Sequence, residues 1–182
     1  NLPGYGDLLV KPKNTLECAI ILNVCYNNKI PVTISAGQTN LTGSATAQGG
    51  VVLSISKLNT PNITIDKKLM EVESPVGIPL EKLRNKILEL TGSQLYYPID
   101  PTSRHDAFVG GTLSCNASGF IPGTKGATRY WVNAIEVLLP NGQMIRAKRG
   151  QYFSNNGVFI LKDKKHIKLK VPRYHRPNLK NA

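Results

Sequence analysis

The sequence predicts an α+β fold in two lobes, a small parallel sheet with helices followed by a larger antiparallel sheet with helices. Three observations support this prediction. The first 55 residues follow the order strand, helix, strand, loop, strand, which is typical of a parallel crossover unit. Residues 62–73 and 134–146 each contain two short runs of strand-forming residues around a turn, as in antiparallel hairpins. The chain has 182 residues, 41% of them apolar and 19% charged, which is ordinary for a globular domain and excludes coiled coil and collagen-like repeats.

The first lobe is expected over about residues 1–58. Residues 7–10 form a short strand, and Asn14 with Glu17 three residues later has the spacing of a capping box, so a helix begins here and runs to about residue 27. Residues 30–34 are short and β-branched, which indicates a buried strand. Residues 51–55 are the third strand of the parallel sheet.

The second lobe is expected over about residues 59–176. Residues 62–66 and 69–73 flank Lys67-Lys68 as a hairpin with one solvated face. Pro79 stands at the start of a helix that ends at Gly92. The apolar stripe of that helix consists of Leu80, Leu83, Ile87 and Leu90.

Two further strand signals follow late in the second lobe. Residues 134–139 form an apolar strand, which the turn at 140–142 reverses into residues 143–146. Ile167, Leu169 and Val171 alternate with basic residues, which predicts a strand with one basic face. Residues 177–182 are interpreted as the start of a linker, and the whole chain as a single domain.

The net charge of +12 is concentrated at one end of the chain. Residues 143–182 hold eleven of the 23 Lys and Arg but a single acid, Asp163, so this segment carries +10 and residues 1–142 carry +2. A basic segment can bind nucleic acid, an anionic membrane or an acidic protein surface, or it can be a solvated strand face. The few aromatic residues of the segment form no stacking array, so we expect no nucleic-acid partner.

Several classes of protein are excluded or disfavoured. No apolar run approaches the roughly 20 residues that span a bilayer, and nothing indicates membrane association. The chain begins at Asn1 without a basic and apolar leader, so no signal peptide is visible. Three sequons could accept glycans but lack evidence of secretion; they are at Asn40, Asn62 and Asn116.

The cysteines and histidines predict neither a metal site nor disulfides. The chain has three Cys without a CxxC pair, and its three His have no metal-ligand spacing. Free thiols are ordinary in a reducing compartment, so we expect a cytoplasmic protein.

The loop of residues 35–43 is the first candidate binding element. It leaves the carboxyl end of a buried strand, where ligands gather in parallel sheets. Its small residues and two glycines let successive backbone N–H groups converge on one point, which suits a pyrophosphate. The loop lacks the patterns of a P-loop and of a Rossmann fingerprint. A tight connection without a ligand is the alternative interpretation.

Residues 97–119 are the second candidate. They combine rigid prolines, small polar residues and the pair Gly110-Gly111, which would let backbone approach a flat ligand closely. The alternative is a long irregular surface loop. Segments of more than about 20 residues without secondary structure are usually functional or disordered.

Three stretches carry a resemblance to a known family: residues 31–58 (PVTISAGQTNLTGSATAQGGVVLSISKL), 97–119 (YPIDPTSRHDAFVGGTLSCNASG) and 135–142 (IEVLLPNG). Together they resemble the PCMH-type FAD-binding domain of vanillyl-alcohol-oxidase-type FAD-linked oxidases, closest to the glycolate oxidase and D-lactate dehydrogenase subgroup. The resemblance covers nearly the whole chain in order. It implies FAD extended between two α+β lobes, in an oxidoreductase whose intact form oxidises a small 2-hydroxy acid to a 2-oxo acid.

The resemblance also assigns residues to parts of FAD. The pyrophosphate falls to the backbone of Ser35, Ala36, Gly37, Gln38, Thr39, Asn40, Leu41, Thr42 and Gly43. The ribityl chain and isoalloxazine fall to Pro98, Asp100, Pro101, Ser103, Gly110, Gly111 and Thr112. The remaining phosphate and ribose contacts fall to Asn116, Ser118, Gly119 and Gly126, and the adenine to the backbone of Ile135. No histidine lies in residues 35–43 or 97–103, and His105 is interpreted as structural, so noncovalent FAD is expected.

The sequence departs from the family pattern in two ways. Gln38 and Asn40 stand where glycine is common, which adds bulk near the phosphates. The chain stops at Ala182, where the family continues into a further glycine-rich segment and a substrate-binding cap domain. We therefore expect this chain alone to be inactive and to bind FAD more weakly than an intact relative. No catalytic residue is assigned, since Arg104 and His105 are interpreted as part of an exposed turn.

Two other functions remain as alternatives. One is a non-catalytic basic module that binds nucleic acid or an anionic surface through the +10 segment. The other is a cell-wall precursor reductase sharing this domain, which the pattern of residues 98–119 fits less well.

Overall fold

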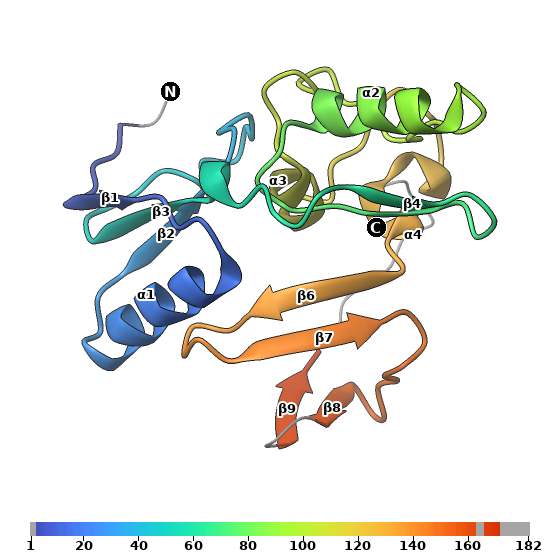
Figure 1. Ribbon diagram of the computed structural model, residues 1–182. Helices are drawn as coiled ribbons and strands as arrows, with labels where there is room; N and C mark the ends of the chain where they lie inside the picture. The colour runs from blue at the N-terminus through green and yellow to red at the C-terminus, as the bar shows by residue number, and fades with distance from the viewer. Residues whose placement is uncertain (1–2, 163–165, 172–182) are drawn as a thin grey trace.

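The computed structural model describes residues 3–162 and 166–171. Its first lobe is a three-stranded parallel sheet with the strand order β1 (Leu8–Val10), β3 (Val51–Ser54), β2 (Val32–Ser35). Helix α1 (Thr15–Asn27) connects β1 to β2 and lies against one face of this sheet (Figure 1). The predicted parallel crossover unit is confirmed.

Helix α1 begins where the capping-box spacing predicts. The Asn14 side chain accepts a hydrogen bond from the Glu17 backbone N–H at 2.9 Å, and the Glu17 carboxylate accepts one from the Lys13 N–H at 2.7 Å. Donors that would otherwise lack a partner at the helix start are thereby satisfied. Below the cap, Cys18 packs on Leu53 of β3, and this contact fixes α1 on the sheet.

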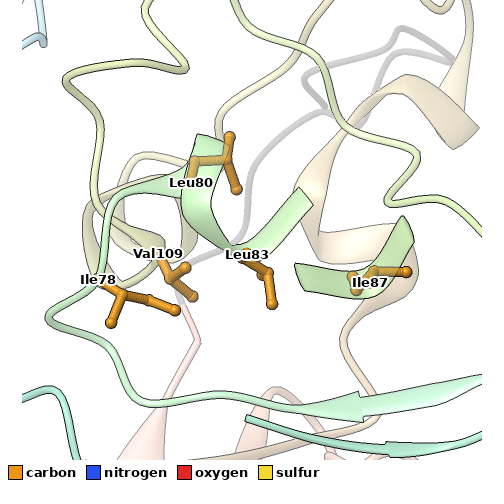
Figure 2. Packing of buried hydrophobic residues seen from close by; sticks show 5 residues of the cluster. All are labelled: Ile78, Leu80, Leu83, Ile87 and Val109. Carbon is orange, nitrogen blue, oxygen red and sulfur yellow. The ribbon is translucent and has the colours of Figure 1, made fainter. Parts of the chain in front are cut away.

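The second lobe is built around helix α2 (Leu80–Thr91), which follows Pro79 and ends at Gly92 in the left-handed conformation. Its core joins four residues of 78–87 to one residue of the short helix α3 (Val109–Ser114), and Figure 2 shows them: Ile78, Leu80, Leu83, Ile87 and Val109. Leu90 was predicted in this stripe and is 40% exposed instead. Thr91 is the buried residue of the last turn, where its hydroxyl donates to the Ile87 carbonyl at 2.7 Å.

The antiparallel strands form three two-stranded ladders. They are β4 (Thr64–Asp66) with β5 (Glu71–Glu73), β6 (Ala134–Leu138) with β7 (Met144–Lys148), and β8 (Val158–Lys162) with β9 (His166–Lys170). The predicted α+β fold, with a small parallel sheet followed by antiparallel strands, is confirmed, and the described antiparallel strands form separate two-stranded sheets instead of one larger sheet. Each described hairpin pairs only with itself.

Some elements were not predicted. They are strand β8, helix α4 (Thr128–Trp131), the 3-10 turns η1 (Ile55–Lys57) and η2 (Thr124–Gly126), and helix α3. The most informative of them is α3, which includes Gly110 and Gly111. It lies within residues 97–119, for which the sequence left open an irregular surface loop. Glycine disfavours helix by about 1 kcal/mol relative to alanine, so packing rather than propensity determines α3.

The β6–β7 hairpin connects the second lobe to the first. Its turn lies on α1, where the Asn23 side-chain N–H donates to the Asn141 carbonyl at 2.9 Å. A Cβ at Gly142 would lie 2.5 Å from the Ala19 carbonyl oxygen, so only glycine permits this approach. Leu138 also packs on the cluster between α1 and β3. The proposed linker at 177–182 lies outside the described residues.

Candidate functional site

A hollow of about 440 Å³ opens on the first lobe. It is lined by Gly6, Leu9, Lys11, Ser35, Ala36, Gln38, Val52 and Ser54. Side chains alternate between the two faces of a strand, and Val10 and Leu53 pack on the α1 side. The neighbours Leu9 and Val52 therefore point to the opposite face, where the hollow lies. Its volume is within the roughly 300–1,000 Å³ of small-molecule pockets.

The loop that follows β2 borders this hollow at the carboxyl end of the parallel strands. In the described part of the chain, no backbone N–H of residues 37–45 donates a hydrogen bond to another protein group. None of residues 37–45 is buried, so solvent can reach the loop. Nine backbone N–H groups without a described protein partner, beside a hollow, can donate to an anionic ligand.

Side chains of the loop bond to each other. Gln38 has a φ of 54°, in the left-handed region that favours glycine. Its amide N–H donates to the Ser35 hydroxyl at 3.1 Å. The Asn40 amide donates to the hydroxyls of Thr42 at 3.1 Å and Ser44 at 2.7 Å. Both side chains at the positions where glycine is common thus stabilise the loop without a ligand.

The loop touches the second lobe through backbone. A Cβ at Gly37 would lie 1.9 Å from the Asp106 carbonyl oxygen and 3.2 Å from the Ala107 Cα. A Cβ at Gly111 would lie 3.3 Å from the Ala36 Cβ. The structure therefore brings together the two segments that the sequence singled out, residues 35–43 and 97–119.

An ion-pair cluster holds residues 97–104 on α2. The Arg84 guanidinium donates to the carbonyls of Tyr97 at 3.2 Å and Ile99 at 2.8 Å. Arg104 lies 3.0 Å from both the Asp100 and the Glu81 carboxylates. The buried Glu81 Oε2 accepts no hydrogen bond, so its contact with the Arg104 Nε is an ion pair without hydrogen-bond geometry.

This cluster determines what several predicted residues can do. The Asp100 carboxylate bonds to Arg104 and faces Arg84 at 3.7 Å, so it is engaged by protein. Residues 104–106 lie in a turn as predicted, and His105 and Asp106 are exposed. The Arg104 side chain is only 34% exposed and is ion-paired. Gly119 packs on residue 100, where a Cβ would lie 2.1 Å from the Asp100 carbonyl oxygen.

The other predicted residues mostly stabilise local structure. Thr112 is buried, and its hydroxyl donates to the Val109 carbonyl at 2.8 Å. The Asn116 side chain accepts from the Arg129 N–H at 3.0 Å. Ser118 forms an isolated β-bridge with Ala127, next to the buried Gly126.

The remaining predicted residues lie in two places. The segment that Arg84 of α2 holds contains Pro98, Pro101 and Ser103. Ile135 lies in β6 opposite Ala147, and no described contact joins it to the loop.

Two groups have perturbed acidity. Burial raises the pKa of the Tyr97 phenol, although the Arg84 guanidinium partly lowers it. Burial and the nearby Glu17 charge raise the pKa of the Cys18 thiol. Both groups are therefore neutral near pH 7, and a neutral thiol is a poor nucleophile.

Sequence reasoning missed five of the eight residues that line the hollow: Gly6, Leu9, Lys11, Val52 and Ser54. The available signal was strand alternation, which places alternate residues of β1 and β3 on the face away from α1. In residues 3–162 and 166–171 no cluster of three His, Cys, Asp or Glu could hold a metal. None of the helices described is long and apolar enough to cross a membrane.

Comparison with known proteins identifies the family. Residues 6–148 match the family model described as "FAD binding domain". The chain belongs to this FAD-binding domain family. It is 36% identical to D-lactate dehydrogenase of Anaerostipes hadrus over 156 residues, which are 85% of this chain and 32% of that protein. It is 33% identical to glycolate oxidase subunit GlcD of Bacillus subtilis (strain 168) over 141 residues, 77% of this chain and 29% of that protein.

Solved structures agree on the fold of this FAD-binding domain. Glucooligosaccharide oxidase from Acremonium strictum matches with a TM-score of 0.66 at 16% identity, over 79% of this chain and 30% of that one. Alkyldihydroxyacetonephosphate synthase matches with a TM-score of 0.65 at 20% identity, over 78% and 28%. The chain thus spans about a third of the length of these relatives.

The residues present fit the phosphate part of FAD. The loop offers unpaired N–H groups, and the adjoining hollow adds the hydroxyls of Ser35 and Ser54 and the cation of Lys11. Hydrogen-bond donors and a positive charge are what a diphosphate requires.

Proposed function

We propose that this FAD-binding domain holds the cofactor at the loop of residues 37–45 and along residues 97–119, as part of an enzyme that oxidises a small 2-hydroxy acid. The observation that carries the proposal is the run of unpaired backbone N–H groups beside the hollow. These N–H groups make no described hydrogen bond within the protein, so they are free to donate to a phosphate in place of water.

The chain's own residues bind and orient in this proposal. The loop N–H groups donate to the phosphates, and the backbone contact between Gly37 and Asp106 keeps the loop against the second lobe. Arg84 fixes residues 97–99 through two carbonyls, which makes that wall of the site rigid. When bound, FAD supplies a two-electron acceptor for hydride.

The substrate class comes from the relatives. D-lactate dehydrogenase and the glycolate oxidase subunit GlcD are named for small 2-hydroxy acids. A substrate carboxylate needs a cation and the hydroxyl proton needs a base. Arg104 is already paired with two carboxylates, so we assign neither role within this chain. We place both in a substrate-binding cap domain of the intact enzyme.

We propose that FAD is held without a covalent bond. In glucooligosaccharide oxidase the FAD is linked through cysteinyl and histidyl groups. Here residues 35–43 and 97–103 contain neither histidine nor cysteine. Acid precipitation of the flavin-loaded protein should release the flavin to the supernatant, whereas a yellow pellet would contradict noncovalent binding. A cytoplasmic location also stays a proposal, in keeping with three unpaired thiols.

Titration of the purified chain with FAD, followed by flavin fluorescence, tests the main proposal. We expect saturable binding that ADP displaces. The complete gene product, loaded with FAD, should be reduced anaerobically by glycolate or D-lactate. A chain that ignores FAD but binds nucleic acid with strong salt dependence would support the basic-module alternative instead.

A further inference from the structure

The structure points to a residue of the phosphate site that the sequence did not suggest. The ten residues 35–44 contain no lysine or arginine, so the loop offers neutral donors only. A diphosphate carries negative charge, and sites that bind it commonly add a cation to the backbone donors. A cation at this site therefore comes from another segment of the chain.

Lys11 has both the position and the charge of such a cation. It lines the hollow together with Ser35, Gln38 and Ser54. The strand register explains why: Val10 pairs with Leu53, so the next residues along β1 and β3 are Lys11 and Ser54. Ser54 in turn pairs with Ser35. Lys11, Ser54 and Ser35 therefore form one row across the carboxyl ends of the three strands, on the face away from α1.

The Lys11 charge is also available. Among the described residues, no acidic side chain forms an ion pair with it, while Arg84 and Arg104 are both paired. Its side chain is exposed, so the ammonium group can move toward a ligand.

We propose that Lys11 binds the diphosphate of FAD and that Ser35 and Ser54 line the same phosphate subsite. This inference rests on the proposed function, because it assumes that FAD is the ligand. It adds a charged contact from the residue after β1 to the backbone contacts of the loop.

Binding measurements on the 182-residue chain test this. The variants are Lys11→Gln, Lys11→Arg, and Lys13→Gln as a control that removes an equal charge two residues away. Flavin fluorescence reports FAD and riboflavin, and calorimetry reports ADP. We expect Lys11→Gln to weaken FAD and ADP about tenfold, the usual effect of losing one charge-assisted hydrogen bond. Riboflavin has no phosphate and should bind unchanged, Lys11→Arg should keep most of the affinity, and Lys13→Gln should behave as the parent.

Salt provides a second readout. Raising the ionic strength should weaken FAD binding by the parent more than by Lys11→Gln, since the exposed charge contact is screened. If Lys11→Gln and Lys13→Gln lose equal FAD affinity, the effect comes from net charge in general and the assignment of Lys11 is overturned. The assignment is also overturned if Lys11→Gln loses as much affinity for riboflavin as for FAD. If the parent binds FAD and Lys11→Gln is unchanged, the inference fails while the proposed function stands. If the parent binds no FAD, both fall.

Discussion

Replacing Gly37 by alanine tests whether the loop and the second lobe are held together by backbone contact. The new methyl carbon would lie 1.9 Å from the Asp106 carbonyl oxygen and 2.8 Å from its carbonyl carbon. A normal contact is about 3.5 Å, so the two segments must separate by about 1.5 Å. Both neighbouring groups are backbone and cannot rotate away.

Overpacking of this kind costs about 1–3 kcal/mol, and we expect the upper end because neither segment can yield locally. For a chain of this size, about 3 kcal/mol corresponds to a fall of roughly 6–12 °C in Tm. Thermal unfolding followed by circular dichroism measures the fall. FAD affinity should drop at least tenfold, because the loop is displaced from the wall formed by residues 97–111.

The matched control is Gly111→Ala, on the other side of the same contact. Its methyl group would meet only the Ala36 Cβ, at 3.3 Å, and alanine favours the α3 helix by about 1 kcal/mol over glycine. This variant should unfold within about 1 kcal/mol of the parent. If Gly37→Ala is as stable as Gly111→Ala and binds FAD equally well, the two lobes do not meet as described.

Two further substitutions probe the walls of the site. Glu81→Gln removes the negative charge between Arg84 and Arg104. It should lower the free energy of unfolding by about 1 kcal/mol or less, because these side chains are partly exposed. In urea unfolding, the difference in stability between the variant and the parent should shrink as salt is added. Gln38→Gly replaces a residue whose backbone is in the left-handed region and removes the amide that donates to the Ser35 hydroxyl. The stability of the chain should change little, and FAD should bind at least as tightly as to the parent, because the Ser35 O–H can donate to a phosphate in both chains. Clearly weaker binding in the fluorescence titration would mean that the Gln38 side chain itself serves the ligand.

Local signals made much of the fold predictable. The start of α1 follows from Asn14 and Glu17, whose side chains bond to nearby backbone, and the end of α2 follows from Gly92 in its left-handed conformation. Such features depend on residues within a few positions of each other, so they are visible in the chain. The apolar stripe of α2 is confirmed at Leu80, Leu83 and Ile87 for the same reason.

The failures have a common physical cause. Helix α3 contains Gly110 because a Cβ there would lie 2.9 Å from the Val76 Cβ, a contact between residues 34 positions apart that no local pattern reveals. The clasp of Arg84 on residues 97–99 is likewise a tertiary feature. Gly110, which the sequence interpreted as room for a flat ligand, provides room for Val76 instead, and Gly119, which was assigned to the phosphate and ribose contacts, provides room for the backbone of Asp100.

This second use of glycine changes how the loop should be understood. A loop made of small residues can present its N–H groups to an anion, but Gly37 shows that it must also fit against the backbone of Asp106. The two requirements act on the same few residues, so the shape of the phosphate loop depends on the position of the second lobe. A ligand that binds only the joined lobes stabilises them by mass action, by about 2.7 kcal/mol at a hundredfold excess over Kd. Saturation with FAD should therefore raise the Tm of the parent, and by less in Gly37→Ala, whose lobes no longer meet at the geometry that the cofactor requires.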